Sequence, residues 1–275
     1  MATLDQTTAD VVRLRYETAP VRRERILELI RQVGFGSAGE LAAILNVSEM
    51  TVRRDFRRLA EQGLVRQVHG GVSALTTVAG PIDFRLRATQ HQGAKRAIAD
   101  RAIGLLRPGS VVGLDAGTTT LEVARQLADG LRLTVVTHSL PAMGALTARP
   151  SIDVIGLGGH LHAETQAFAG TMTVQAIGEI RMNTLLLAMT AIRAGEMWCT
   201  NTFDADTKRA LINAADRVVL LADSSKFGAT AVMRVAPLDA IQTLITDDGL
   251  DSQSRRDFER SGIEVVIVED RSERA

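Results

Sequence analysis

Apolar residues recur along this chain in two different patterns. Up to about residue 75 they follow helical spacing, whereas from residue 93 onward short continuous apolar runs alternate with helical stretches. Continuous apolar runs are typical of strands that are covered on both faces, as in parallel sheets. The pattern predicts a small helical domain followed by an α/β domain with a largely parallel sheet.

Three helices are expected in the first part. RRERILELIRQV carries apolar residues at helical spacing and is followed by a glycine, which commonly ends a helix. The stretch SAGELAAILN begins with Ser37 and has Glu40 three residues later, which is a capping-box pattern. We expect its Leu41, Ile44 and Leu45 to face the core.

The third helix is expected in SEMTVRRDFRRL, where Ser48 can serve as the amino-terminal cap. At about 100° per residue, Val52, Phe56 and Leu59 form one narrow apolar stripe. The opposite face and its flanks carry Met50, Thr51, Arg53, Arg54, Arg57 and Arg58. A helix that is supported by two others and presents arginines outward is typical of a recognition helix in the major groove.

The positive charge of this face is local. The whole chain has 32 basic and 32 acidic side chains, and residues 21–72 hold nine arginines against six acids. A solvated cationic helix face is the alternative interpretation, because most charge runs are of that kind.

The next stretch, GLVRQVHGGVSAL, alternates apolar and polar residues on both sides of a glycine turn and predicts a hairpin. A hairpin in that place is a wing, from which Arg66 and His69 can reach the DNA backbone or minor groove. A plain turn role for His69 is the alternative.

The stretch from RRERILELIRQV to GLVRQVHGG resembles the winged helix-turn-helix of the DeoR family of bacterial transcriptional regulators. SEMTVRRDF followed by GLVRQVHGG is specific to that family, and the resemblance implies double-stranded operator DNA as a partner. The predicted DNA-binding residues are Ser37, Ser48, Glu49, Met50, Thr51, Arg53, Arg54, Arg57, Arg58, Arg66 and His69. The predicted domains are an amino-terminal arm at 1–19, the winged helix-turn-helix at 20–75 with its helix-turn-helix motif at about 37–56, a linker at 76–92 with Gly80-Pro81 as a bend, and a sensor domain at 93–275.

Polar clusters follow several apolar runs in the second part, among them DAGTTT, THS, GGH, DSSK and TDD. Open α/β sheets bind ligands at the carboxyl ends of their strands. In DAGTTT, Gly117 permits a tight turn, and the next helix directs its N–H groups and threonine hydroxyls at an anion. Lys226 can add a full charge. These features predict a phosphate site; an ordinary strand–turn–helix with a threonine cap and a surface lysine is the alternative.

DAGTTT also fits the first phosphate loop of actin-like sugar kinases, in which the loop joins two strands of a hairpin. Here LEVARQLADG follows, with Leu121, Ala124 and Leu127 at helical spacing. The kinase interpretation is therefore rejected.

DAGTTT, VVTHSL, VIGLGG, the glycine of AFAG, KRALI, LLADSSKFG and LITDD resemble the sensor domain of the DeoR family, which is similar to ribose-5-phosphate isomerase and binds sugar phosphates. The resemblance implies a phosphorylated sugar as effector. By this resemblance the effector-binding residues are Asp115, Gly117, Thr118, Thr119, Thr120, His138, Ser139, Gly159 and Lys226. Three positions depart from the family. His138 stands where Asn is usual, and Asn183 stands where Asp is common. LAMTAI at 187–192 stands where the family usually has a glycine-rich stretch that carries an acid. The identity of the sugar therefore does not follow from the resemblance.

Composition excludes several functions. Aromatic residues make up 3% of the chain, too few for a broad stacking surface for single-stranded nucleic acid. Cys199 is the only cysteine, so no intrachain disulfide can form, and no base stands beside it. His91, His160 and His162 lack metal-ligand spacing, so neither a metal nor a cofactor is expected. No signal peptide and no bilayer-spanning run is present, which predicts a cytoplasmic protein without a membrane partner.

The expected function is a sequence-specific transcriptional regulator, a repressor of a carbohydrate catabolic operon, that responds to a phosphorylated sugar or a related metabolite. One alternative is a sugar-phosphate isomerase-like enzyme with a DNA-binding appendage, whose base would be Asp115, Glu122 or Asp223, although each also fits another role. An architectural DNA binder is a further alternative, but it leaves the polar clusters unexplained. Because one recognition helix covers few base pairs, a homodimer or homotetramer is expected.

Overall fold

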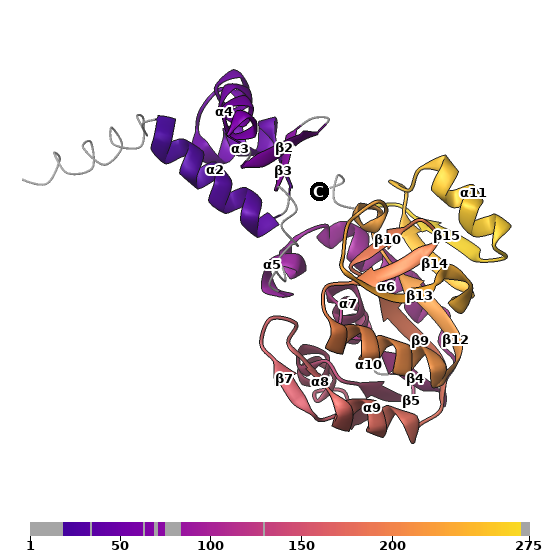
Figure 1. Ribbon diagram of the computed structural model, residues 1–275. Helices are drawn as coiled ribbons and strands as arrows, with labels where there is room; N and C mark the ends of the chain where they lie inside the picture. The colour runs from indigo at the N-terminus through magenta and orange to yellow at the C-terminus, as the bar shows by residue number, and fades with distance from the viewer. Residues whose placement is uncertain are drawn as a thin grey trace, which may run out of the picture. The chain divides into compact units, whose positions relative to one another are not determined.

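The two apolar patterns correspond to two structural units, residues 1–82 and residues 83–275 (Figure 1). The computed structural model describes residues 19–33, 35–62, 64–68, 71–74, 84–128 and 130–270. Each unit is described by itself below. Within the described residues, no helix combines the length and the apolarity needed to cross a lipid bilayer.

The amino-terminal unit is a winged helix-turn-helix. Its helices are α2 (Ala19–Val33), α3 (Ala38–Leu45) and α4 (Glu49–Glu61), and its strands are β1 (Phe35–Ser37), β2 (Val65–Val68) and β3 (Gly71–Ala74). The predicted hairpin is confirmed, because β2 and β3 pair antiparallel with Val68 opposite Gly71. Strand β1 is not evident from the sequence pattern; it pairs with β3 and gives the sheet order β1-β3-β2.

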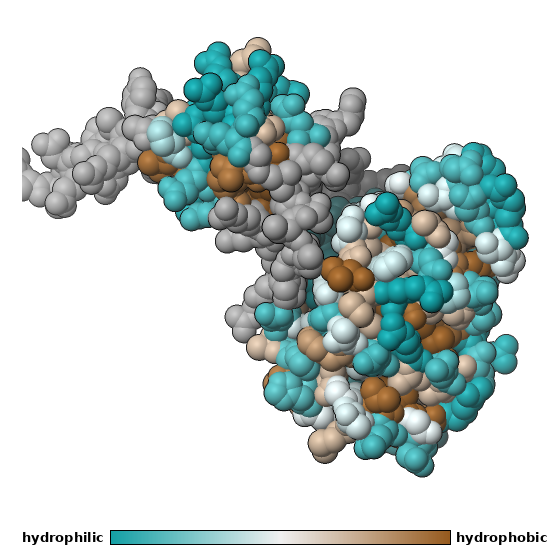
Figure 2. All heavy atoms as spheres, in the orientation of Figure 1, coloured by the Kyte–Doolittle hydropathy of each residue, from teal (hydrophilic) through white to brown (hydrophobic). Residues whose placement is uncertain are grey.

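The core of this unit confirms the predicted stripe on α4, since Val52, Phe56 and Leu59 are all buried. The prediction that Ile44 faces inward is wrong, because this side chain is 63% exposed. The buried face of α3 is formed by Ala38, Leu41 and Ala42, and helical geometry puts Ile44 roughly 110° away from the centre of that face. The surface over α4 is largely hydrophilic (Figure 2).

A buried ion pair joins the first and third helices of this unit. Arg22 Nε of α2 lies 2.6 Å from Asp55 Oδ2 of α4, and Asp55 is only 3% exposed. Asp55 therefore lies on the inner side of α4, among its apolar residues. Removing one member of a buried pair leaves the other charge without compensation, which makes such pairs sensitive to substitution.

The carboxyl-terminal unit is built on a parallel sheet of seven strands in the order β15-β14-β12-β9-β4-β5-β6. The strands are β4 (Val111–Leu114), β5 (Leu133–Thr137), β6 (Ile152–Gly156), β9 (Met182–Ala188), β12 (Ala215–Leu221), β14 (Thr243–Asp247) and β15 (Glu264–Val268). Each of these seven strands contains one of the short continuous apolar runs that follow residue 93, so the predicted parallel sheet is confirmed. The chain order reverses at β4, which has β5 on one side and β9 on the other.

Helices and two small sheets complete this unit. The helices are α5 (Phe84–Thr89), α6 (Gln92–Ile103), α7 (Thr118–Gln126), α8 (Leu140–Leu146), α9 (Thr171–Gly178), α10 (Thr202–Asn213) and α11 (Ser252–Arg260), with short 3-10 turns η1 (Ser224–Lys226) and η2 (Leu238–Ala240). The small antiparallel sheets are β7 (His160–His162) with β8 (Ala167–Ala169), and β10 (Ala191–Arg193), β11 (Glu196–Cys199) and β13 (Met233–Pro237) in that order.

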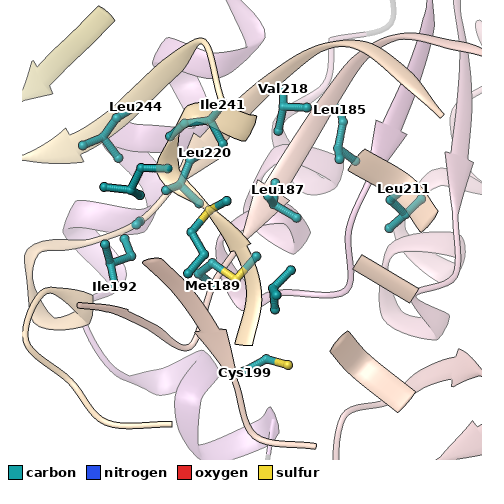
Figure 3. Close-up of a cluster of buried hydrophobic side chains, with 14 of the residues drawn as sticks. Leu185, Leu187, Met189, Ile192, Cys199, Leu211, Val218, Leu220, Ile241 and Leu244 are labelled. Carbon is teal, nitrogen blue, oxygen red and sulfur yellow. The ribbon is translucent and has the colours of Figure 1, made fainter. Parts of the chain in front are cut away.

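Both faces of the large sheet are covered, which explains the continuous apolar runs. Leu185 and Leu187 of β9 pack on one side with residues of α9, α10 and α11 (Figure 3). Leu186, between them in sequence, packs on the other side with residues of α6, α7 and α8. Because successive side chains of a strand point to opposite faces, every position of β9 from Leu185 to Leu187 must be apolar.

The structure differs from the predicted linker at its carboxyl end. Residues 84–89 form helix α5, in which Phe84 is 4% exposed, and helix α6 begins at Gln92. Short helices held by tertiary packing have weak sequence periodicity, which is why the sequence pattern predicts a linker here. Residues 76–83 of the predicted linker, including Gly80-Pro81, and the predicted arm up to residue 18 lie outside the described residues.

Substitution of Asp55 by Ala is expected to destabilise the amino-terminal unit by about 3 kcal/mol, because it removes the buried carboxylate that pairs with Arg22. The measurement is urea unfolding of the full chain, with the helix content as the signal. Glu61→Ala is the matched control: it removes another acid from α4, one that is exposed and 3.9 Å from Arg58, and should change stability by no more than about 0.5 kcal/mol. Equal effects of both substitutions would contradict the structural role of the buried pair.

Candidate functional site

The exposed face of α4 is held in place by a capped amino terminus. Ser48 Oγ accepts a hydrogen bond from Thr51 N–H at 3.3 Å and lies 2.9 Å from the Thr51 hydroxyl. Glu49, in the first turn, forms an ion pair with Arg53 at 3.2 Å in which both side chains are more than half exposed. An exposed pair of this kind contributes little to stability, so Arg53 can exchange it for another anion at small cost.

The remaining arginines of α4 point away from the core. Arg54 and Arg57 are exposed, and neither forms an ion pair with any residue that the structure describes. Arg58 lies 3.9 Å from Glu61, again with both side chains exposed. Met50 is 71% exposed beside them, which is unusual for a methionine and suits contact with a thymine methyl group.

The other predicted DNA-binding residues have different surroundings. Ser37 caps α3: its hydroxyl accepts from Glu40 N–H at 3.2 Å, and the Glu40 carboxylate accepts from Ser37 in return. Arg66 lies in wing strand β2, opposite Ser73. His69 lies outside the described residues. DNA contact stays a prediction for Ser37, Arg66 and His69, as it does for the residues of α4.

In the second unit, a cluster of buried charged groups lies where the strand order reverses. Asp115 follows β4 and is fully buried. Its Oδ2 accepts hydrogen bonds from Ala188 N–H, at the end of β9, at 3.0 Å and from Lys208 of α10 at 2.5 Å. Lys208 also donates to the Ala188 carbonyl at 3.0 Å and lies 3.5 Å from Asp204. The carboxyl ends of strands at such a reversal are where open α/β sheets bind ligands.

His138, which follows β5, adjoins this cluster. Its Nε2 is 3.7 Å from Asp115 Oδ1, and the imidazole is 1% exposed. Asp115 Oδ1 and His138 Nδ1 are both buried without a hydrogen-bond partner in the described part of the chain. Buried polar atoms are nearly always paired, so unpaired ones on two neighbouring side chains point to a bound hydroxyl or water.

The charge states of the cluster follow from its burial and its internal pairing. Burial alone would raise the pKa of Asp115, but the neighbouring Lys208 ammonium lowers it below its ordinary value. Burial likewise opposes the charge of Lys208, yet the Asp115 and Asp204 carboxylates raise its pKa. For His138 burial dominates and lowers the pKa, so the imidazole is neutral near pH 7. The cluster therefore holds an ionised pair beside a neutral imidazole.

The amino terminus of α7 lies directly after Asp115. Its cap is Gly117, which has no side chain to accept from the first-turn N–H groups. The Thr120 hydroxyl is used internally, because it donates to the Asp115 carbonyl at 2.6 Å and accepts from Gly117 N–H at 2.9 Å. The hydroxyls of Thr118 and Thr119, by contrast, make no hydrogen bond within the described residues. An uncapped helix terminus with two available hydroxyls is suited to an anion.

Two predicted glycines are required by close packing. Gly117 has an ordinary extended conformation, with φ −130°, so the tight turn expected there is not the reason for glycine. A Cβ on Gly117 would lie 2.4 Å from the Ala188 Cβ. Gly159, at φ +143°, is strained for other residues, and its Cβ would lie 2.1 Å from the Thr173 hydroxyl.

Ser139 and Lys226 lie at other strand ends. Ser139 caps α8 by accepting from Ala142 N–H at 3.4 Å. Lys226, in the η1 turn after β12, lies 3.3 Å from Asp223 Oδ2, and its side chain is 23% exposed. Its positive charge and that of Lys95 help to hold the pKa of the buried Asp223 below the ordinary value.

The structure thus brings Asp115, Gly117 and His138 together, and it places Lys226 in a second group around Asp223. Two buried lysines that complete these groups, Lys208 and Lys95, are missing from the predicted site. Lys208 follows Asp204 by one helical turn in DADTKRALI, and a lysine among the apolar positions of a helix is the signal that indicates it. Two open hollows of the surface, along α11 and between α9 and α10, lie away from both groups.

The remaining candidates have structural surroundings. Cys199 is buried, and burial raises the pKa of its thiol to about 12, so it is not a nucleophile. His162 stacks on Phe203 with ring centroids 3.6 Å apart, and His160 packs edge-on against His162. Among the described residues no three His, Cys, Asp or Glu side chains form a group that could hold a metal ion.

A winged helix-turn-helix joined to an α/β unit with a polar site at its strand reversal defines a DNA-binding regulator with a ligand-sensing domain. The comparison with known families agrees. The model of the DeoR-like helix-turn-helix domain matches residues 22–78, and that of the DeoR C terminal sensor domain matches residues 90–248. The chain belongs to the DeoR family of transcriptional regulators.

Relatives of the chain align with it over nearly their whole length. The chain is 29% identical over 250 residues to the putative aga operon transcriptional repressor of Escherichia coli O157:H7. This alignment covers 90% of this chain and 93% of that protein. It is 34% identical over 248 residues to the L-fucose operon activator of Haemophilus influenzae, which covers 90% and 99%. The protein is therefore a DNA-binding transcriptional regulator and not an enzyme.

One solved structure that resembles the chain in part is the ribose 5-phosphate isomerase A of Methanocaldococcus jannaschii. It aligns with a TM-score of 0.37 and 16% identity, over 50% of this chain and 55% of that one.

Replacement of His138 by Asn is expected to reduce the loss of stability in acid. Because the folded-state pKa of His138 is lowered, only the unfolded chain takes up a proton as the pH falls below 6.5. The wild-type protein should then lose up to about 1.4 kcal/mol of stability per pH unit from this group, and His138→Asn should lose less. The measurement is chemical unfolding as a function of pH. The exposed His160→Asn is the control and should keep the wild-type slope; a wild-type slope in His138→Asn would contradict burial of a neutral imidazole.

Proposed function

We propose that this protein is a sequence-specific repressor of a carbohydrate catabolic operon and that a phosphorylated sugar modulates its operator binding. The observation that carries the proposal is the uncapped amino terminus of α7 beside the Asp115–His138–Lys208 cluster. Together they offer an anion site at the α7 terminus and buried polar groups for hydroxyls, among them Asp115, three residues before Thr118.

The chemistry of the two parts matches the two ends of a sugar phosphate. The α7 terminus provides N–H groups and the Thr118 and Thr119 hydroxyls, which suit phosphate oxygens. Asp115 Oδ1 can accept a hydrogen bond from a hydroxyl, and His138 Nδ1 can accept or donate a hydrogen bond according to its tautomer. Since Asp115 and Lys208 already neutralise each other, the cluster favours a neutral polyol over a second anion.

Repression is the sign of regulation that we propose. The relative in Escherichia coli O157:H7 is named a repressor, whereas the one in Haemophilus influenzae is named an activator. A winged helix that occupies its operator without effector represses when the operator overlaps the promoter. An effector that stabilises an arrangement of the protein with low operator affinity then releases the operon from repression.

We further propose that the working form is a homodimer or homotetramer. One α4 helix presents four arginines and reads only a few base pairs, so a second copy on a neighbouring half-site is needed for specific affinity. Operator sequences selected by the full chain from random DNA should contain two related half-sites. Light scattering gives the number of copies in solution, and a monomer on a single half-site would contradict this part.

Arg54→Ala is expected to weaken binding to the selected operator by about 1–3 kcal/mol and to relax its sequence preference, because Arg54 lies near the centre of the exposed face. Arg58→Ala, at the edge, is the matched comparison and should mainly reduce the salt dependence, as loss of a phosphate contact does. Fluorescence anisotropy with operator and scrambled DNA at several salt concentrations measures both. Equal losses on both DNAs for both variants would show that the face is only electrostatic.

Thr119→Val and Lys226→Ala are expected to weaken the binding of sugar phosphates by about ten-fold or more, since each removes a donor to the anion. Operator binding without effector should stay within about two-fold of wild type, because both residues belong to the second unit. Calorimetry with a panel of pentose and hexose phosphates gives the affinities. The exposed Thr147→Val is the control; unchanged affinity in Thr119→Val and Lys226→Ala would place the phosphate elsewhere.

A further inference from the structure

Helix α4 carries an acidic residue beside the face that is proposed to approach DNA. Two of the three acids of this helix lie elsewhere, since Asp55 is buried and Glu61 ends the helix. The third, Glu49, lies in the first turn and is about 40° around the helix from Arg53. A carboxylate in this position opposes binding to a polyanion, so its contacts indicate what it is for.

The Glu49 carboxylate is held between two helices. Its Oε2 accepts a hydrogen bond from Arg53 Nη2 at 3.2 Å, one helical turn further along α4. Its Oε1 lies against the first turn of α3, where a Cβ on Gly39 would be only 3.3 Å away. The glycine therefore leaves room for this carboxylate. The Ser48 cap on Thr51 N–H fixes the turn from which Glu49 extends.

The arginine that Glu49 holds keeps donors for DNA. A guanidinium group has five N–H donors in a fixed planar arrangement, and Glu49 uses one of them. The same geometry lets an arginine donate two hydrogen bonds to O6 and N7 of a guanine in the major groove. A side chain whose orientation is already set loses less entropy when it forms such a pair. Arg54 and Arg57, which have no ion pair in the described chain, lack this support.

The pair also limits what Arg53 can do on the wrong sequence. In water an exposed ion pair is weak, so Arg53 can leave it at small cost. At a DNA surface, however, departure of Arg53 to a phosphate would leave the Glu49 carboxylate unpaired among phosphates. Like charges brought together in an interface cost free energy and suppress the wrong partner. Glu49 therefore favours the arrangement in which Arg53 stays paired and reads a base.

We propose that Glu49 determines specificity in the DNA-binding unit: held against Gly39 of α3, it positions Arg53 for a guanine of the operator half-site and keeps it from the phosphates. The inference rests on the proposed operator binding through α4 and adds which arginine is preset and by what. Stabilisation of the helix is the alternative role, because an acid in the first turn complements the helix dipole and pairs with a base four residues later. The two roles predict different results at single atoms of the DNA.

The test compares the operator selected from random DNA with copies in which one guanine at a time is replaced by 7-deazaguanine, which lacks the N7 acceptor. The penalty at a guanine is the ratio of the two affinities, so a general change in affinity cancels. In the wild type, the guanine that Arg53 reads should show a penalty of about five-fold, and Arg53→Ala should abolish the penalty at that guanine. Fluorescence anisotropy of the full chain gives the affinities.

Glu49→Gln keeps the shape of the side chain and removes its charge. The penalty at the guanine of Arg53 should fall to about two-fold, and the penalties at the other guanines should stay at the wild-type level. Affinity for scrambled DNA should rise, and its log–log dependence on salt should steepen by about 0.9, because Arg53 then contacts one more phosphate. Glu61→Gln is the matched control: it removes an exposed acid of α4 that lies 3.9 Å from Arg58, and it should leave every penalty unchanged.

Gly39→Ala tests the contact with α3 without changing either charge. The added Cβ crowds Glu49 Oε1 and displaces the carboxylate. Since alanine favours a helix more than glycine does, the unfolding temperature should not fall. The penalty at the guanine of Arg53 should fall as it does in Glu49→Gln. An unchanged penalty would refute the role of α3 in holding Glu49.

The outcomes separate this inference from the proposed function. If Glu49→Gln lowers every guanine penalty alike, or none of them, Glu49 stabilises the helix or adds general charge, and the inference is refuted. If Arg53→Ala abolishes no penalty, Arg53 reads no guanine; the inference is then refuted while operator binding stands. If the full chain selects no operator from random DNA, the proposed function fails and the inference fails with it.

Discussion

The Asp115 carboxylate is the group on which the sensor unit depends. It is fully buried at the end of β4, and it is stable there because Lys208 and the Ala188 N–H satisfy Oδ2. This arrangement joins β4, β9 and α10 at the point where the strand order reverses. It also leaves Oδ1 unpaired next to His138, so the same carboxylate that holds three elements together offers an acceptor to a ligand. The structure of the sensor unit and the proposed ligand recognition therefore depend on one ion pair.

The DNA-binding unit solves the opposite problem, because it must present charge outward from a helix that is otherwise packed. On α4 the inner side holds Val52, Phe56 and Leu59 together with Asp55, which pairs with Arg22 of α2. The outer side keeps arginines whose exposed partners are weak. A helix that is fixed on one face and carries loosely paired guanidinium groups on the other can exchange those partners for phosphates and base edges with little reorganisation.

Helix α5 is the first described element after the wing. It has six residues, and its described anchors include the buried Phe84 side chain, a backbone hydrogen bond to the Glu164 carbonyl and the Lys95 side chain. A helix of this length is not stable alone, so its order depends on these tertiary contacts. Elements of low local stability are the ones that can respond to a ligand.

Elements with a local and periodic signal were predictable from the sequence alone. The α4 stripe, the wing hairpin and the seven continuous apolar runs each report a repeating environment, and each has the predicted form. The DNA-binding and sensor domains were also identified from short motifs such as SEMTVRRDF and DAGTTT. Contacts between residues far apart in the chain, by contrast, become visible only in the folded structure. Arg22 with Asp55, Lys208 with Asp115, and Lys95 with the α5 carbonyls have no periodic signature, because a single buried charge is placed by its partner and not by its neighbours in sequence. The same reason explains why the sequence did not predict the exposure of Ile44 or the presence of helix α5: what packs against a short helix decides which face it buries and whether it forms.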